Sequence, residues 1–135
     1  MTPLITANQL EEMINSGENV LICDCRFDLV DPLAGRKTYL EGHIPGALYV
    51  DLDHDLSGEK TGKNGRHPLP TPEAWAKTKS RLGFDSNTLV IAYDNQGSVY
   101  ASRLWWMLKA TGHANVQVLD CLLYTSDAAD EEDSV

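Results

Sequence analysis

Short apolar runs alternate with helical patterns along most of this 135-residue chain, and this alternation constrains the fold more than any other feature. The runs carry few polar side chains and are too short for helices, which is typical of strands buried on both faces. They lie within residues 19–27, 47–53, 88–93 and 115–120. Strands connected through helices predict βαβ units, and therefore a parallel sheet with helices on both of its faces.

The connecting segments carry helix signals. Thr6 is a candidate N-cap before an amphipathic stretch that ends at Gly17, and Pro72 opens a second helix that ends at Gly83. Further helical patterns lie within residues 35–47 and 98–112, which come after the apolar runs within residues 19–27 and 88–93. Between the second run and Pro72 lies a long polar stretch without periodicity, and connections of that length are often functional.

Composition excludes several classes of protein. A hydrophobic share of 42% with 23% charged residues is typical of a globular domain, and one domain fits this length. No apolar run approaches membrane-spanning length and residues 1–13 resemble no export signal, so we expect a cytoplasmic protein that does not enter a membrane. The net charge of −9 argues against binding to nucleic acid.

The alternating pattern stops after Asp120. Residues 121–135 contain a dense cluster of acids, with neither a capping signal nor a sustained apolar stripe. We therefore expect residues 1–120 to form the domain and residues 121–135 to be an acidic, disordered tail. Two origins of this tail fit the composition: a natural tail, or a segment that is not native to the domain.

Three motifs, in this order, resemble the rhodanese-like sulfurtransferases. The sequence "CDCRF" is similar to the family's Asp-x-Arg, "YLEGHIPGA" to its His-Ile-Pro-Gly-Ala turn, and "DNQGSVYASRLWWMLKATGH" to its active-site loop and following helix. The resemblance covers residues 4–120 and implies a three-layer α/β sandwich with a central, mostly parallel five-stranded sheet. It is closest to the N-terminal half of two-domain thiosulfate and 3-mercaptopyruvate sulfurtransferases.

One position departs from the catalytic members of that family. Their first residue after the strand is a cysteine, whose thiolate is stabilised by loop amides and the helix N-terminus while it carries a persulfide. Here that residue is Asp94, and a carboxylate accepts hydrogen bonds but carries no sulfane sulfur. The resemblance therefore implies an inactive loop, formed by Asp94, Asn95, Gln96, Gly97, Ser98 and Val99.

The cysteines are Cys23, Cys25 and Cys121. Cys23 and Cys25 lie two apart on an expected strand, so their side chains share one face. With no second Cys or His pair at ligand spacing, we interpret them as small buried hydrophobes and predict no metal site. None of the three lies in a glycine loop that would activate a nucleophile.

His67 has two interpretations. Alone in a polar loop, it is a solvated histidine. The resemblance aligns His67 and Asp53 with a histidine and an aspartate that, in mercaptopyruvate sulfurtransferases, reach toward a serine near the second domain's cysteine. A carboxylate-oriented imidazole there would move protons during sulfur transfer.

Four other sites receive mainly structural interpretations. We expect Asp24 and Arg26 to tie strand ends to loops, with substrate binding by Arg26 as the alternative. His43 is expected to fix a turn, and Arg103 to pair with a nearby acid. Trp105 and Trp106 are adjacent, so one is expected in the core and the other against a missing partner domain.

Together, the resemblance implies the N-terminal rhodanese domain of a sulfurtransferase that needs no cofactor. The full protein would move sulfur from thiosulfate or 3-mercaptopyruvate to a thiol or cyanide, through a cysteine persulfide in a missing C-terminal rhodanese domain. The chain alone would be inactive. Both donors stay open, with His67 and Asp53 favouring 3-mercaptopyruvate. The alternative is a stand-alone, non-catalytic rhodanese-like module that binds a partner or an anion.

Overall fold

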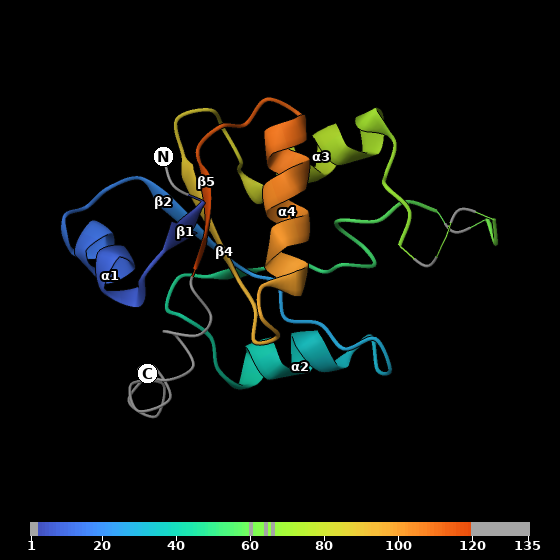
Figure 1. The fold of residues 1–135 in the computed structure, drawn as a ribbon, viewed down its shortest axis with the longest axis horizontal. Helices are drawn as coiled ribbons and strands as arrows, with labels where there is room; N and C mark the ends of the chain where they lie inside the picture. The colour runs from blue at the N-terminus through green and yellow to red at the C-terminus, as the bar shows by residue number, and fades with distance from the viewer. Residues whose placement is uncertain (1–2, 60, 64, 66, 120–135) are drawn as a thin grey trace.

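A five-stranded sheet forms the centre of the computed structural model, which describes residues 3–59, 61–63, 65 and 67–119. The strand order is β1-β5-β4-β2-β3, and every described pairing is parallel. The strands are β1 (Leu4–Ile5), β2 (Val20–Asp24), β3 (Leu48–Tyr49), β4 (Leu89–Tyr93) and β5 (Val116–Leu119). The helices, which lie on both sides of the sheet (Figure 1), are α1 (Ala7–Asn15), α2 (Ala34–Glu41), α3 (Pro72–Leu82) and α4 (Val99–Ala110).

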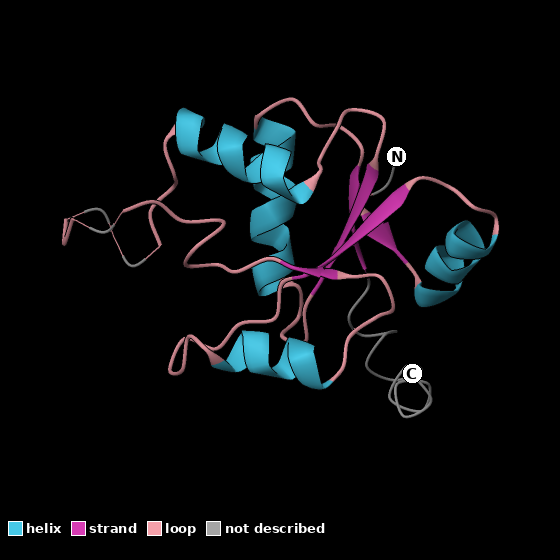
Figure 2. Cartoon of the chain, turned by 180° about the vertical axis from the view of Figure 1, so that it is seen from behind, coloured by secondary structure: helices cyan, strands magenta, loops and turns pink. Residues whose placement is uncertain are grey.

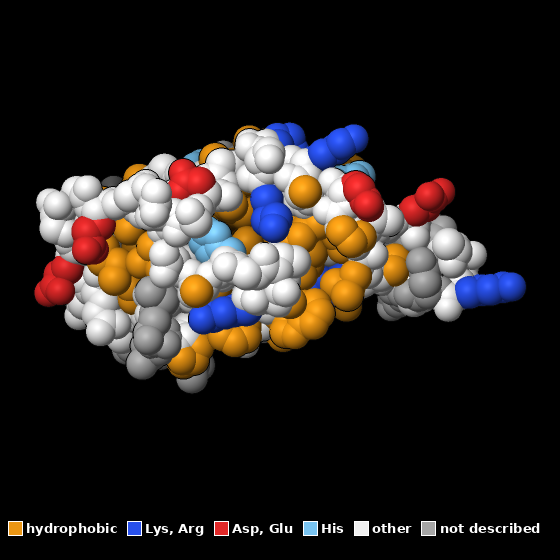
Figure 3. Space-filling model, turned by 90° about the horizontal axis from the view of Figure 1, so that it is seen from above, with side chains coloured by type: hydrophobic (Ala, Val, Ile, Leu, Met, Phe, Trp, Pro, Cys, Tyr) orange, Lys and Arg blue, Asp and Glu red, His pale blue; other side chains and the backbone are white. Residues whose placement is uncertain are grey.

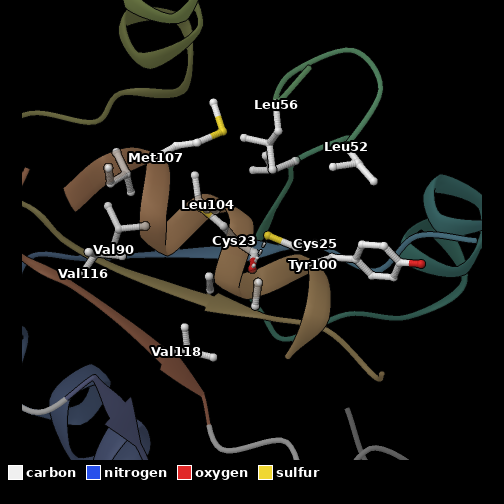
Figure 4. Packing of buried hydrophobic residues seen from close by; sticks show 14 of the residues in the cluster. Cys23, Cys25, Leu52, Leu56, Val90, Tyr100, Leu104, Met107, Val116 and Val118 are labelled. Atoms are coloured by element: carbon white, nitrogen blue, oxygen red, sulfur yellow. Dashed lines mark hydrogen bonds between the residues drawn. The ribbon is translucent and has the colours of Figure 1, made fainter. Parts of the chain in front are cut away.

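Side chains alternate along the strands and face two separate cores, which confirms the α/β class predicted from the sequence. The first core joins the sheet to α3 and α4, and Figure 4 shows strand residues such as Val90 and Val118 facing Leu104. The second core joins the opposite face to α1 and α2, through residues such as Ile22 and Ile91. Because both faces are covered, the strands read as continuous apolar runs.

The predicted helix signals act as expected. The Thr6 side chain accepts a hydrogen bond from the Gln9 amide and forms a capping box with it. Thr71 caps α3, which begins with Pro72 and ends at Gly83 in the left-handed conformation. The predicted N-cap at Thr6, the predicted helix start at Pro72 and the predicted helix end at Gly83 are therefore confirmed.

Two elements differ from the sequence prediction. The strand β1 is only two residues long, too short to give a periodic pattern, and the sequence reading did not predict it. The strand β3 is shorter than the predicted 47–53, because the chain folds into a turn in which the Asp55 amide donates to Asp51 O. The predicted tail, residues 121–135, lies outside the described residues.

The carboxyl ends of β2, β3 and β4 lead into the connections to α2, α3 and α4, and the longest of them, between β3 and α3, extends to one side of the molecule (Figures 1 and 2). In open parallel sheets, this edge is where functional groups gather.

Among the described residues, no helix is long and apolar enough to cross a bilayer.

Candidate functional site

Asp94 fills a cradle of backbone amides at the start of α4. Its side chain is fully buried. Oδ1 accepts hydrogen bonds from the amides of Gln96 and Ser98 at 2.8 and 3.0 Å, and Oδ2 accepts from Tyr100 and Ala101, both at 2.8 Å. A negative charge is stabilised at this end of a helix. The carboxylate is therefore an internal anion that satisfies four amides at once.

The loop backbone is bent so that these amides converge. Gly97 and Ser98 have φ angles of 67° and 72°, and among the described residues Ser98 is the one non-glycine residue with positive φ. Such a conformation costs about 1 kcal/mol or more and persists where surrounding contacts impose it. The Gln96 side chain adds one such contact, donating to Phe27 O at 3.2 Å. Asn95, Gly97 and Val99 are exposed.

Asp24 and Arg26 form a pair at the end of β2. Arg26 donates to both Asp24 oxygens, and its Nη2 lies 2.6 Å from Oδ2 and 2.6 Å from Gly42 O. Tyr93 completes the group by donating to Asp24 Oδ2 while accepting from the Ile44 amide. Burial and the Asp24 carboxylate raise the pKa of Tyr93. These contacts tie two strand ends to the turn at residues 42–46; substrate binding by Arg26 stays a prediction.

His43 belongs to the same turn. Its Nδ1 lies 2.7 Å from Tyr39 O, and its ring stacks on the Tyr39 ring with centroids 3.9 Å apart. These contacts give His43 the structural role that the sequence suggested.

The structure brings His67 and Asp53 together, while their role in proton transfer stays a prediction. Nδ1 of His67 lies 3.1 Å from Oδ1 of Asp53, and each side chain is 20% exposed. The Nε2 atom of His67 is buried without a hydrogen-bond partner in the described part of the chain. The same holds for Nδ1, so the two side chains are in ion-pair contact while neither ring nitrogen makes a hydrogen bond in that part of the chain.

Phe27 links this pair to the Asp94 loop. Its ring makes edge contacts with His67 at 5.9 Å and with Tyr100 at 5.7 Å between centroids. Its carbonyl accepts the Gln96 hydrogen bond described above. The three connections at the carboxyl edge therefore meet around one buried phenylalanine.

Arg103 differs from the prediction. The sequence suggested an acid as its partner, but Nη2 donates to three carbonyls: Leu56 O at 2.8 Å, His67 O at 2.9 Å and Pro68 O at 3.3 Å. Burial lowers the pKa of its guanidinium. The long connection offers backbone acceptors beside α4, which a sequence pattern does not reveal.

The described cysteines are unsuited to nucleophilic chemistry. Cys23 and Cys25 are buried in the first core, and Figure 4 shows Cys25 Sγ, which lies 3.9 Å from Cys23 O. Burial, helped by the negative charge of Asp24, raises the pKa of both thiols. They stay protonated near neutral pH, and a protonated thiol is a poor nucleophile. The described residues contain no cluster suited to a metal ion, and Cys121 lies outside them.

Trp105 and Trp106 separate as adjacent helical residues do. Trp105 packs against the first core, while Trp106 is 50% exposed. Figure 3 shows hydrophobic surface over the side of the molecule that carries α3 and α4. Whether a partner domain covers Trp106 stays a prediction.

Sequence reasoning missed two members of the site. Tyr93 is the last residue of an apolar run. In the sheet it is the register partner of Asp24, so the two side chains lie on the same face, where Tyr93 donates to the Asp24 carboxylate. Phe27 follows the Asp-x-Arg motif and is fully within the core. No pattern in the sequence indicates that it would connect His67 with the Asp94 loop.

A family model described as the rhodanese-like domain matches residues 6–121. The chain is 42% identical over 117 residues to a Mycobacterium tuberculosis protein named "Putative thiosulfate sulfurtransferase SseB", covering 87% of this chain and 41% of that protein. It is 41% identical over 119 residues to a Pseudomonas aeruginosa protein named "Probable 3-mercaptopyruvate sulfurtransferase", covering 87% and 42%. The chain thus spans about two fifths of the length of these curated relatives.

Solved structures give the same result for the fold. The crystal structure of SseA from Escherichia coli, described as a 3-mercaptopyruvate sulfurtransferase with the rhodanese fold, superposes with a TM-score of 0.75 at 29% identity, over 94% of this chain and 48% of that one. The 3-mercaptopyruvate sulfurtransferase from Leishmania major gives a TM-score of 0.80 at 25% identity, over 91% and 34%.

Proposed function

Because the chain belongs to the rhodanese-like domain family, we propose that it is the N-terminal, non-catalytic domain of a two-domain sulfurtransferase. One observation carries the proposal: the carboxylate of Asp94 occupies the amide cradle in which a catalytic domain would hold its cysteine. The relatives, of which this chain matches about two fifths, support the presence of a second domain.

In the whole protein, the cysteine thiolate of the second domain attacks the transferable sulfur of the donor, which breaks its bond to that sulfur and leaves as sulfite (from thiosulfate) or pyruvate (from 3-mercaptopyruvate). The persulfide then passes its outer sulfur to a thiol or to cyanide and the cysteine thiolate is restored. This domain contributes the carboxyl edge of its sheet, where His67 and Asp53 are in contact. The imidazole, held through Nδ1, moves a proton during the transfer by way of its Nε2 atom. No cofactor takes part in this chemistry.

The His67–Asp53 contact favours 3-mercaptopyruvate over thiosulfate as donor, since an oriented histidine serves a reaction that includes proton transfer. The names of the relatives include both donors. A non-catalytic module that binds an anion in the Asp94 loop is less well supported, because the amides of that loop are already occupied.

The proposal is tested by the reading frame that continues after Asp120 in the gene. We expect a second rhodanese unit with a cysteine in its loop, and turnover by the two-domain protein with 3-mercaptopyruvate or thiosulfate. Replacing that cysteine with serine should abolish turnover, because no other persulfide carrier remains. A two-domain protein that keeps its activity without this cysteine would refute the proposal, and a gene without a second unit would favour the stand-alone module.

A further inference from the structure

Arg103 joins the two ends of the long connection between β3 and α3. It lies on α4, and its Nη2 donates to Leu56 O at the start of the connection and to His67 O and Pro68 O near its end. A single guanidinium group therefore bridges segments that are about eleven residues apart in the sequence, counting from residue 56 to residue 67.

A second contact closes the same place, which we call the loop neck (residues 56–58 and 67–70). The Gly58 amide donates to Pro68 O at 2.7 Å. The two sides of the neck are also very close: a Cβ built on Gly58 would lie 2.7 Å from Leu69 O and 3.0 Å from Pro70 Cα. Glycine is thus required for this approach, because any side chain at residue 58 would push the two sides of the neck apart.

His67 belongs to this neck. Its carbonyl is held by Arg103, while its ring lies beside Asp53 and Phe27. A loop residue free at its backbone samples many conformations, and fixing it costs conformational entropy that the surrounding contacts must offset. The charge-assisted hydrogen bond from Arg103 to the His67 carbonyl offsets part of this cost. It fixes the backbone of His67 and thereby restricts the positions of the ring nitrogens.

The shape of the arginine side chain suits this task. All three contacts come from Nη2, whose two N–H groups are fixed in the plane of the guanidinium and are shared among the three carbonyls, whereas a lysine ammonium is a flexible point charge. The acceptors are neutral carbonyls, so the guanidinium binds the backbone of the neck rather than a carboxylate side chain.

We propose that Arg103 is a positioning residue that holds His67 against Asp53 by fixing the loop neck to α4. The catalytic consequence rests on the function proposed above, but the positioning itself is a property of this chain and is measurable without any activity.

The test is NMR of the 135-residue chain with methionine in place of Arg103. In the parent, we expect nuclear Overhauser contacts between the rings of His67 and Phe27. In Arg103→Met, these contacts should disappear, and the His67 ring signals should move toward those of Asp53→Asn. Trypsin should also cut about tenfold faster within residues 59–66, because the loss of a charged hydrogen-bond donor makes the neck open more often.

The matched control is Lys109→Met, which removes an exposed cation from the same helix and should leave the His67 signals unchanged. Circular dichroism reports whether each variant is folded. A folded Arg103→Met chain that keeps the ring contacts would overturn the proposal. If Arg103→Met does not fold, Arg103→Lys decides: weakened ring contacts would support the positioning role, and parent-like ring contacts and His67 signals would overturn it, because the hydrogen bonds of Nη2 would then not be what holds His67. Neither result depends on a second domain.

Discussion

Replacing Asp94 with alanine is expected to lower the free energy of unfolding by about 4 kcal/mol. The substitution removes a buried, charged acceptor and leaves the amides that donate to it without a partner. Four amides, those of Gln96, Ser98, Tyr100 and Ala101, donate to this carboxylate in the structure. Domains are stable by only about 5–15 kcal/mol, so the midpoint of thermal unfolding should fall by roughly 15 °C or more.

Urea and thermal unfolding followed by circular dichroism measure this effect. Asp94→Asn keeps one acceptor oxygen and should give an intermediate loss. Asp31→Ala is the matched control: Asp31 is exposed, and its side chain accepts from the Leu33 amide at 3.1 Å. That variant should lose no more than about 1 kcal/mol. An Asp94→Ala chain as stable as the parent would show that the amides find other partners, and the carboxylate would not be the structural anion of this loop.

Replacing His67 with alanine in the two-domain protein is expected to reduce kcat with 3-mercaptopyruvate about a hundredfold, which is typical for the loss of general acid–base help. The physical basis is the contact of Nδ1 with Asp53 and the Nε2 atom that the protein leaves without a hydrogen-bond partner in its described part. Asp53→Asn should cost less, because it disturbs the orientation and tautomer of the ring without removing it.

Steady-state kinetics beside circular dichroism separate a chemical role from a folding defect. His54→Ala is the matched control, since His54 is exposed and lies next to Asp53 in the sequence. It should have the kinetics of the parent. Parent-like turnover by a folded His67→Ala protein would show that His67 takes no part in the chemistry and that its contacts with Asp53 and Phe27 are structural.

The fold was predictable because burial on both faces gives each main strand a continuous apolar run, as in residues 20–24 and 89–93. Helix starts such as those marked by Thr6 and Pro72 also act locally, so neighbouring residues determine them. The strand β1 escaped prediction because two residues carry no period, and its pairing with β5 depends on residues more than a hundred positions away.

The candidate site was predictable only in part. The role of Asp94 as an acceptor for amides follows from its chemistry and its place between a strand and a helix. The partners of Arg103 could not be predicted, because every residue has a backbone carbonyl and the residue types at the three acceptor positions therefore do not indicate the contact. The pairing of His67 with Asp53 came from family resemblance, because nothing in the composition of a long polar loop fixes which residues meet.

The central claim, that this domain carries no sulfur itself, is tested most directly by intact-mass spectrometry of the chain after incubation with thiosulfate or 3-mercaptopyruvate. The chain should carry Cys121→Ser, so that only Cys23 and Cys25 remain, and a rhodanese domain with a loop cysteine serves as the positive control. We expect no gain of a sulfur atom, because both thiols are buried and their pKa values are raised. A stable gain of one sulfur atom by the folded chain would contradict the claim and place a persulfide carrier within this domain.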